Sequence, residues 1–236
     1  MNTSYQLSNL LNQEGCNIFG FADLRQLPRE TRHDYDYGII IGAPYTKEAM
    51  EENKNRQPQR YYDEMQAINN RLTHLANLTA DFLSEQGYRA YAKTKAAVSQ
   101  EETNFHFNTI LPYKTVATLA GIGWIGKTAL LVTKEVGSAL RLAAVLTNAP
   151  LECGIPIIKS KCPPNCMFCV NICPGKAAKS KLWEAGMERE EFFDPDACYA
   201  AARASANVLL GKDETICGQC ISHCPITMAG LGYIVD

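Results

Sequence analysis

Residues 162–174 read CPPNCMFCVNICP, a run of four cysteines that ends in Cys-Pro. A shorter run follows: Cys198 stands alone, and residues 217–225 read CGQCISHCP, which again ends in Cys-Pro. Eight of the ten cysteines of this 236-residue chain therefore lie in its last third. Cysteines at such spacing are typical of a site that gathers several thiolates around iron and sulfide.

The spacing predicts two 4Fe–4S clusters, because each cluster needs four thiolates and the two runs supply eight. In two-cluster ferredoxins, the last cysteine of a run ligates the cluster of the other run. We name the two expected sites cluster one and cluster two. The ligands expected for cluster one are Cys162, Cys166, Cys169 and Cys224. The ligands expected for cluster two are Cys173, Cys198, Cys217 and Cys220.

One gap in the first run is wider than the ferredoxin pattern. Three residues, at 163–165, separate Cys162 from Cys166 where ferredoxins have two, and two of the three are prolines. Prolines make a stiff, extended insert. Either Cys162 reaches the cluster through a wider loop, or Cys153 replaces it as a ligand. Cys16 is expected to be a small buried hydrophobe.

Disulfides and zinc are the alternatives to iron and sulfur. Ten cysteines in 236 residues is too low a density for a disulfide scaffold, and the first residues have neither the basic nor the apolar region of a signal peptide. No uncharged apolar run approaches the length of a membrane span. A reducing, cytoplasmic location is therefore expected, where grouped thiols indicate metal binding. Zinc ribbons use paired C-x₂-C knuckles and do not call for Cys-Pro endings.

Composition is that of an ordinary globular protein. The formal net charge is −2, and no basic stripe suggests a nucleic-acid surface. Proline and cysteine become frequent near residue 151. We expect a boundary there, with an α+β domain over 1–150 and a small two-cluster domain over 151–236.

The first domain alternates helix and strand patterns. Amphipathic helices are expected over residues 4–14, ended by Gly15, and over residues 58–86, ended by Gly87. Buried strands are expected over residues 16–22, 37–43, 88–98, 130–133 and 140–147. The last two are expected to pair as a hairpin through residues 134–138. A mixed sheet follows from this alternation.

Residues 121–128 read GIGWIGKT and match the phosphate-loop pattern G-x₄-G-K-[ST]. A phosphate loop needs a strand before the first glycine and a helix starting at the lysine. Here residues 115–120 have a helix pattern and residues 128–133 a strand pattern, which is the reverse order. An iron–sulfur ATPase is therefore the weaker alternative.

The same segment carries a family resemblance. Residues 120–131 (AGIGWIGKTALL), residues 136–138 (VGS) and residues 145–151 (VLTNAPL), together with both cysteine runs, resemble the epoxyqueuosine reductases. These are distantly similar to corrinoid-dependent reductive dehalogenases. The resemblance covers about residues 112–226 and is diffuse before them.

The resemblance implies a nitroreductase-like domain followed by a ferredoxin-like one. It implies that both clusters pass electrons to a corrinoid (cobalamin) or another cofactor or substrate in the first domain. The electron donor would be a ferredoxin or flavodoxin, and the substrate a small molecule or modified nucleoside. An oxidoreductase of unidentified substrate is thus expected.

Two departures from the family argue for a different substrate. The family has an acidic segment of the form D-S-A-P-x-x-E-R-P before the glycine motif, and its Asp is the proposed proton donor. Residues 107–115 read FNTILPYKT here, without the acid; Lys114 keeps the charge of the Arg but not its bidentate geometry. The chain also ends twelve residues after Cys224, without the helical extension of many epoxyqueuosine reductases.

Candidate residues for cofactor and catalysis come from the motif and the segment before it. Gly121, Gly123 and Gly126 would let the backbone approach a bound cofactor closely. Trp124 would form a wall of that pocket or pack in the core, and Lys127 would anchor an acidic group or lie at the surface.

The missing acid leaves the proton donor open. Tyr113, His106 or Glu102 could supply the proton. A structural role is the alternative for His106, which lies between two phenylalanines. A ferredoxin-type electron carrier without its own catalytic site is the alternative function.

Overall fold

The computed structural model of the chain describes residues 2–101 and 108–232. The chain divides into two compact units, each assembled from three stretches. Unit 1 comprises Met1–Ala43, Ile68–Ile122 and Arg141–Ile157. Unit 2 comprises Pro44–Ala67, Gly123–Leu140 and Ile158–Asp236. The boundary after residue 150 stays a prediction.

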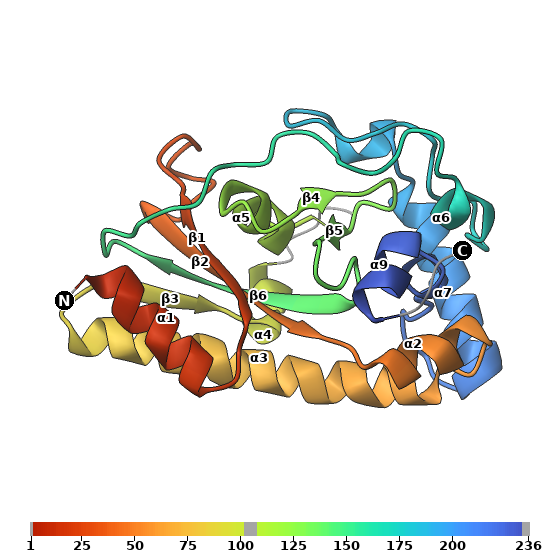
Figure 1. Cartoon of the computed structure of the whole chain (residues 1–236), viewed down its shortest axis with the longest axis horizontal. Coiled ribbons are helices and arrows are strands. Elements are labelled where there is room, and N and C mark those ends of the chain that lie inside the picture. The colour runs from red at the N-terminus through yellow and green to blue at the C-terminus, as the bar shows by residue number, and fades with distance from the viewer. Residues whose placement is uncertain (1, 102–107, 233–236) are drawn as a thin grey trace. The chain divides into compact units, whose positions relative to one another are not determined.

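Unit 1 is built on a four-stranded sheet with the strand order β1-β2-β6-β3 (Figure 1). The strands are β1 (Ile18–Asp23), β2 (Tyr37–Pro44), β3 (Ala90–Lys93) and β6 (Leu140–Thr147). β1 pairs antiparallel with β2, and β3 pairs antiparallel with β6. The central strands are apolar because both faces of the sheet are covered: Ile39, Ile40 and Ile41 are fully buried. The predicted mixed α+β fold is confirmed at this level.

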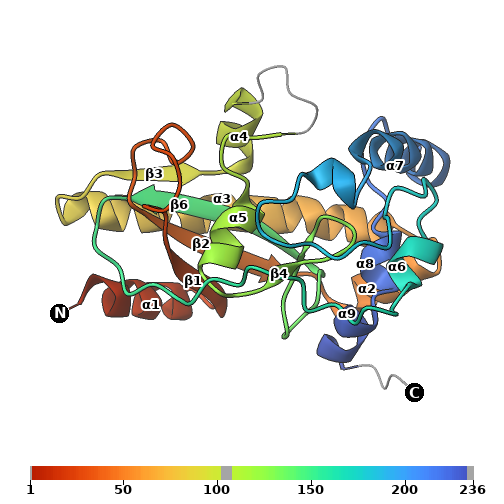
Figure 2. The ribbon, with the colours of Figure 1, turned by 90° about the horizontal axis from the view of Figure 1, so that it is seen from above.

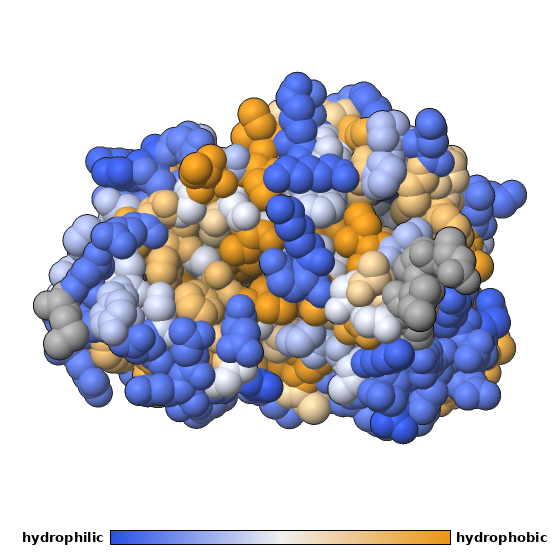
Figure 3. Space-filling view, viewed as in Figure 1, coloured by the Kyte–Doolittle hydropathy of each residue, from blue (hydrophilic) through white to orange (hydrophobic). Residues whose placement is uncertain are grey.

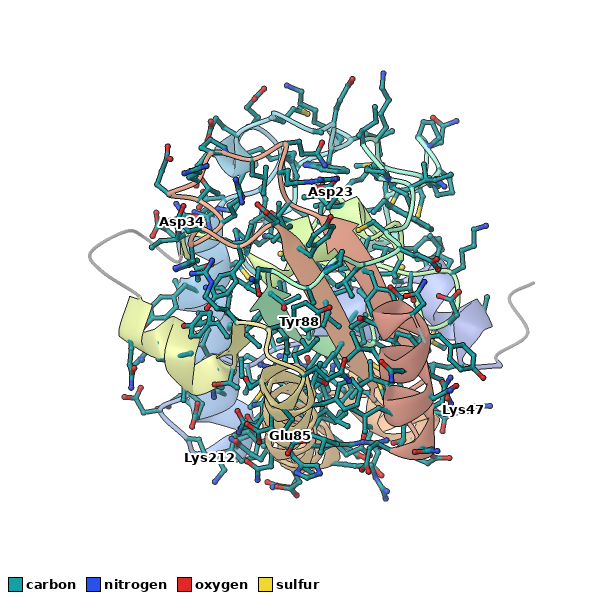
Figure 4. The ribbon with its side chains drawn as sticks, turned by 90° about the vertical axis from the view of Figure 1, so that its left-hand side faces the viewer. Asp23, Asp34, Lys47, Glu85, Tyr88 and Lys212 are labelled. Atoms are coloured by element: carbon teal, nitrogen blue, oxygen red, sulfur yellow. The ribbon has the colours of Figure 1, made fainter. Side chains whose placement is uncertain are left out.

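Helices cover both faces of this sheet. The long helix α3 (Gln59–Glu85), whose Ile68–Glu85 part belongs to unit 1, lies against one face, and α5 (Tyr113–Leu119) lies against the other (Figures 1 and 2). Figure 4 looks along α3 from its Glu85 end, with Tyr88 following where the chain turns toward β3. The predicted apolar stripe of α3 faces the core: Leu72 and Leu75 are at most 3% exposed. Helix α1 (Thr3–Gln13) is also as predicted, and Gly15 follows it with φ +69°.

The strand predicted over residues 88–98 is wrong in its second half. The strand β3 ends at Lys93, and the helix α4 (Lys95–Glu101) begins two residues later. The Thr94 hydroxyl accepts a hydrogen bond from the Ala97 amide at 3.3 Å, the contact of a helix N-cap. A capping threonine therefore ends the strand pattern.

Unit 2 consists mainly of short helices and loops. Its helices α2, α6, α7, α8 and α9 gather together (Figure 2). They span Lys47–Lys54, Phe168–Asn171, Pro195–Leu210, Gln219–Ser222 and Pro225–Gly230, and a 3₁₀ turn covers Arg189–Glu191.

The hairpin predicted between residues 130–133 and 140–147 is wrong. In unit 2, β5 (Leu131–Val132) pairs instead with β4 (Trp124–Ile125), while β6 pairs with β3. The turn between β4 and β5 contains Ala129 at φ +56°, a left-handed conformation that alanine rarely adopts. The hairpin therefore joins β4 to β5, earlier in the sequence than the predicted hairpin through residues 134–138.

Hydrophilic side chains cover most of the face drawn in Figure 3, with apolar side chains between them. Among the described residues, the large apolar side chains that are exposed are Tyr5, Ile110, Ile155, Ile158, Phe168, Ile172 and Val208. No helix in the described part of the chain has the length and apolar character needed to cross a membrane.

Candidate metal centre

Short helices of unit 2 present the cysteines of both runs. Cys169 lies in α6, Cys198 in α7 and Cys220 in α8, while Cys224 is the N-cap of α9. The proline after Cys224 occupies the first turn of α9, where its missing N–H costs no hydrogen bond and its fixed φ favours the helix. The Cys-Pro ending of the second run therefore begins a helix and places Cys224 at its N-cap.

Cys169 lies among the other cysteines predicted for cluster one. Burial and, to a smaller extent, repulsion from nearby Cys224, Cys162 and Cys166 together raise the pKa of the Cys169 thiol to about 11. Burial also raises the pKa of Cys224, to which Cys162 adds. Cys224 comes from the second run, so the two runs exchange their last cysteines at this site.

The remaining cysteines form a second group. Burial raises the pKa of Cys198 to about 11, with contributions from Cys173 and Cys217. Burial raises the pKa of Cys220 well above its ordinary value, and its neighbours include Cys217, Cys198 and Cys173. Cys173 ends the first run but lies with the second. The members of each predicted ligand set are thus electrostatic neighbours, while their binding of iron stays a prediction.

The two groups approach each other through Cys169 and Cys220. Cys169 is among the cysteines whose charge raises the pKa of Cys220, after the larger effect of burial. One belongs to each predicted set. Two clusters held in these groups would therefore come near each other at these two thiolates.

All ten cysteines are free thiols in this structure. Within residues 2–101 and 108–232, no three His, Cys, Asp or Glu side chains converge as the ligands of one metal ion do. A 4Fe–4S cluster makes a different demand, since each of its four irons takes its own thiolate and the ligands stand apart. A group of four neighbouring cysteines is compatible with that demand without meeting the distances of a single-ion site.

Hydrogen-bond donors are directed at several of these sulfurs. The Trp124 indole N–H donates to Cys162 Sγ at 3.3 Å, and the Ala177 amide donates to Cys173 Sγ at 3.3 Å. The Ser205 hydroxyl contacts Cys217, and donors from Thr227 contact Cys224; each of these hydrogen bonds lowers a thiol pKa that burial raises. Donors at thiolates also stabilise a cluster when it gains an electron.

The glycine motif does not have the form of a phosphate loop. The helix α5 precedes it and β4 lies inside it, which is the reverse of the strand–loop–helix order. The side chain of Lys127 is 2% exposed, and its Nζ donates to the carbonyl oxygens of Pro164 and Cys166 at 2.9 and 2.7 Å. The surface-charge alternative for Lys127 is therefore wrong.

The motif's glycines permit close contacts within the chain. A Cβ at Gly123 would lie 2.5 Å from the Val132 carbonyl oxygen. The pairing of β4 with β5 brings this oxygen close, so the position has no room for a side chain. In unit 1, Gly121 adopts φ +74°, and a Cβ there would lie 2.4 Å from the Ile155 carbonyl oxygen. A cofactor role for these glycines stays a prediction.

Other candidate residues lie elsewhere or cannot be placed. Tyr113 is the first residue of α5 in unit 1. Glu102 and His106 fall outside the described residues. Cys16 is 3% exposed, as predicted for a buried hydrophobe. Cys153 lies in unit 1, where burial and then Asp23 raise its pKa.

Sequence reasoning missed the polar contacts between α2 and α8. Asn53 is fully buried; its Nδ2 donates to Ser222 Oγ at 3.2 Å, and its carbonyl oxygen accepts from Gln219 Nε2 at 2.5 Å. These contacts fix the helix that carries Cys220. The one signal in the sequence is Gly218, just before this helix. In the structure it adopts φ +70°, and a Cβ there would lie 2.8 Å from atoms of Asn53 and Tyr61.

A surface cavity of about 430 Å³ borders the first cysteine run. Its walls are Asn165, Met167, Phe168, Asn171, Ile172 and His223. The Phe168 side chain is 59% exposed there. The segment that carries Cys166 and Cys169 is thus accessible from one side.

No family model matches the chain. The epoxyqueuosine reductase of Lactococcus garvieae (strain Lg2) is 29% identical over 186 residues, which are 73% of this chain and 48% of that protein. The chain thus spans about half the length of this relative. The sequence similarity to epoxyqueuosine reductases agrees with the predicted resemblance.

Solved structures share the fold. The catabolic reductive dehalogenase NpRdhA, in complex with 3-bromo-4-hydroxybenzoic acid, has a TM-score of 0.70 and 17% identity, covering 95% of this chain and 32% of that one. An epoxyqueuosine reductase bound to an epoxyqueuosine-modified tRNA-Tyr stem loop has a TM-score of 0.58 and 18% identity, covering 96% and 65%. The likeness to the reductive dehalogenase is one of fold, the similarity to epoxyqueuosine reductases agrees with the predicted resemblance, and the relatives named reductases agree with the predicted oxidoreductase class.

Proposed function

We propose that this chain is an iron–sulfur oxidoreductase similar to epoxyqueuosine reductases. Unit 2 binds two 4Fe–4S clusters, one in each cysteine group, and the clusters pass electrons to a cofactor or substrate. The proposed layout is a nitroreductase-like domain followed by a ferredoxin-like one. The reducing partner is a ferredoxin or flavodoxin.

The exchange of Cys173 and Cys224 between the runs is the observation that carries the proposal. Cys224 raises the pKa of Cys169, and Cys173 raises the pKa of Cys198, in each case after the larger effect of burial. Two separate zinc knuckles would each keep the cysteines of one run together. The exchange supports two clusters that share both runs.

Each cluster, when bound, supplies a centre that accepts and releases one electron. The chain's own residues determine how that centre is held. The half-buried cysteines of unit 2 would bind the iron, and the amide of Ala177 and the indole of Trp124 donate to the sulfurs. Because Cys169 and Cys220 are electrostatic neighbours, they would place two bound clusters near each other.

A corrinoid as electron acceptor rests on the resemblance alone, and no step here runs through it. The substrate class is a small molecule or modified nucleoside, since one relative binds an epoxyqueuosine-modified tRNA stem loop. Residues 107–115 lack the acidic residue expected before the glycine motif, and this supports a substrate other than epoxyqueuosine. Tyr113 remains the described candidate for a proton donor.

The experiment is anaerobic reconstitution with iron and sulfide, followed by a cobalamin titration. About eight irons and eight sulfides per chain are expected, with the electron paramagnetic resonance signals of reduced 4Fe–4S clusters. Cys16→Ser is the matched control, because Cys16 belongs to neither cysteine group. Its iron content should equal that of the wild type.

The outcomes separate the alternatives. Cobalamin spectra that change on binding, and again when the clusters are reduced, support the reductase. Eight irons without corrinoid binding would favour a ferredoxin-type carrier without its own catalytic site. Tight zinc binding without iron or sulfide uptake would refute the cluster assignment itself.

A further inference from the structure

The segment Gly123–Lys127 contacts the loop between the first two cysteines of the cluster-one group. Both belong to unit 2. This loop is the one that contains the extra residue and two prolines. The contacts therefore fall where the first cysteine run departs from the ferredoxin spacing.

Trp124 makes the first contact. Its side chain is 5% exposed, and its indole N–H donates to Cys162 Sγ at 3.3 Å. The indole N–H is a donor only, so it interacts more strongly with a thiolate than with a protonated thiol. This geometry suits a Cys162 that carries negative charge.

Lys127 makes the second contact, on the backbone of the same loop. Its two hydrogen bonds, to the carbonyls of Pro164 and Cys166, hold the loop on both sides of Asn165. A buried ammonium therefore fixes the loop.

Gly126 makes the third contact possible. A Cβ at this position would lie 2.9 Å from Val132 Cγ2 and 3.7 Å from Cys162 Sγ. A Cβ would therefore press on Val132 of the facing strand, while its distance to the cysteine sulfur would be an ordinary contact. The glycine allows the two strands to pair closely where the motif lies beside the sulfur.

We propose that Gly123–Lys127 is the hydrogen-bonding support of cluster one, in which Trp124 raises its reduction potential and Lys127 holds the wide Cys162–Cys166 loop. The motif is then neither a phosphate loop nor a cofactor cradle. The inference rests on the proposed function, because it assumes that the first cysteine group binds a 4Fe–4S cluster.

The physical reason is electrostatic. Reduction adds one electron from a donor protein, or from dithionite in the experiment, and this electron makes the cluster and its thiolates more negative. A hydrogen bond to a thiolate stabilises the more negative state more than the less negative one. The Trp124 donor therefore makes cluster one easier to reduce than it would be without it.

The test is Trp124→Phe in the iron-loaded full chain, measured by redox titration with electron paramagnetic resonance. Phenylalanine keeps an aromatic ring against the sulfur but has no donor. Iron content should stay at about eight per chain, and the midpoint potential of one cluster should fall while the other stays constant. A tenfold change in the reduction equilibrium corresponds to about 59 mV for one electron.

Ser205→Ala is the matched variant at the other site. The Ser205 hydroxyl contacts Cys217, so its removal should lower the potential of cluster two instead. The pair of variants identifies which titration step belongs to which cluster. In the double variant, both potentials should fall by the amounts seen singly.

An isosteric replacement guards against a packing effect of the smaller ring. The chain has two tryptophans, so a Trp183→Phe background leaves Trp124 as the one site for biosynthetic replacement by benzothienylalanine. This residue keeps the bicyclic shape and replaces the N–H by sulfur. The potential should fall as in Trp124→Phe.

The results that overturn the proposal differ from those that overturn the proposed function. Fully loaded Trp124→Phe with unchanged potentials, or with an equal fall of both, would refute the role of Trp124. Benzothienylalanine with a wild-type potential would do the same. A wild-type chain that takes up no iron and sulfide would instead contradict the clusters themselves.

Discussion

The ammonium of Lys127 lies 2.7 Å from the carbonyl oxygen of Cys166, and the lysine side chain is 2% exposed. A hydrogen bond to a charged group contributes about 1.5–3 kcal/mol to stability. Lys127→Met keeps the length of the side chain but removes the donor. The variant should lose about this much free energy of unfolding and should load cluster one poorly, so that iron falls from about eight toward four per chain.

Lys134→Met is the control for this prediction. Lys134 lies in unit 2 as well, but its side chain is exposed. Its replacement should leave the iron content unchanged and the free energy of unfolding within about 0.5 kcal/mol of the wild type. Chemical denaturation of the reconstituted protein and an iron assay provide the readouts. Equal effects of both substitutions would mean that the carbonyl contacts of Lys127 are unimportant.

The exchange of cysteines between the runs predicts which variants share a spectrum. Cys224→Ser and Cys169→Ser should show the same remaining signal, that of cluster two, because both remove a ligand of cluster one. Cys173→Ser and Cys220→Ser should both show the signal of cluster one, since both remove a ligand of cluster two. Electron paramagnetic resonance of the reduced variants checks the pairing. If Cys173→Ser matched Cys169→Ser instead, the runs would not exchange their last cysteines.

The sequence predicts the elements whose signal is local. The burial period of α3 and the continuous apolar run at Ile39–Ile41 are readable because neighbours in sequence share an element. The pairing of Leu131 with Ile125 was missed because the residue at positive φ in its turn is Ala129 and not a glycine. Local patterns of residue type cannot reveal an alanine held in that conformation by its surroundings.

The candidate site divides in the same way. Cysteine spacing predicts the two sets, since ligands of one cluster come mostly from one run. The contact of Trp124 with Cys162 joins residues 38 positions apart, and nothing in either local sequence points to the other. The tryptophan was therefore expected at a cofactor pocket or in the core, and its donor role is visible only in three dimensions.

Gly137 connects the strand pairing of unit 2 to the helix that begins at Cys224. It has φ +57°, and a Cβ there would lie 2.5 Å from both the backbone nitrogen and Cα of Thr227 in α9. Gly137→Ala should displace α9 and with it Cys224, so that iron content falls and the free energy of unfolding decreases by more than about 2 kcal/mol.

Gly211→Ala separates the effect of the clash from that of the backbone angle. Gly211 has φ +63°, but a Cβ there would meet nothing within 4 Å. The cost should be about 1–2 kcal/mol, with iron content unchanged. Circular dichroism melts and iron assays compare the two variants. Full iron loading of Gly137→Ala would show that α9 tolerates the shift.

Cys153 should be the cysteine that reacts in the iron-loaded protein. Cys16 is buried, and the eight cysteines of the two groups would bind iron, whereas Cys153 is only half-buried and lies outside both groups. Burial raises the pKa of Cys153 and the Asp23 carboxylate raises it further, while Arg25 opposes them. Since the thiolate is the reactive form, alkylation should be slow near neutral pH and should increase at higher pH than in the unfolded chain.

Asp23→Asn tests the cause of this shift. The substitution removes a negative charge beside Cys153 and releases Arg25 from its 2.7 Å ion pair, and both changes lower the pKa of Cys153. Alkylation near neutral pH, followed by mass spectrometry, should become faster. Asp34→Asn is the control, because Asp34 is not among the charges that shift Cys153. Protection of Cys153 in the loaded protein together with alkylation of Cys162 would instead identify Cys153 as the ligand that completes cluster one.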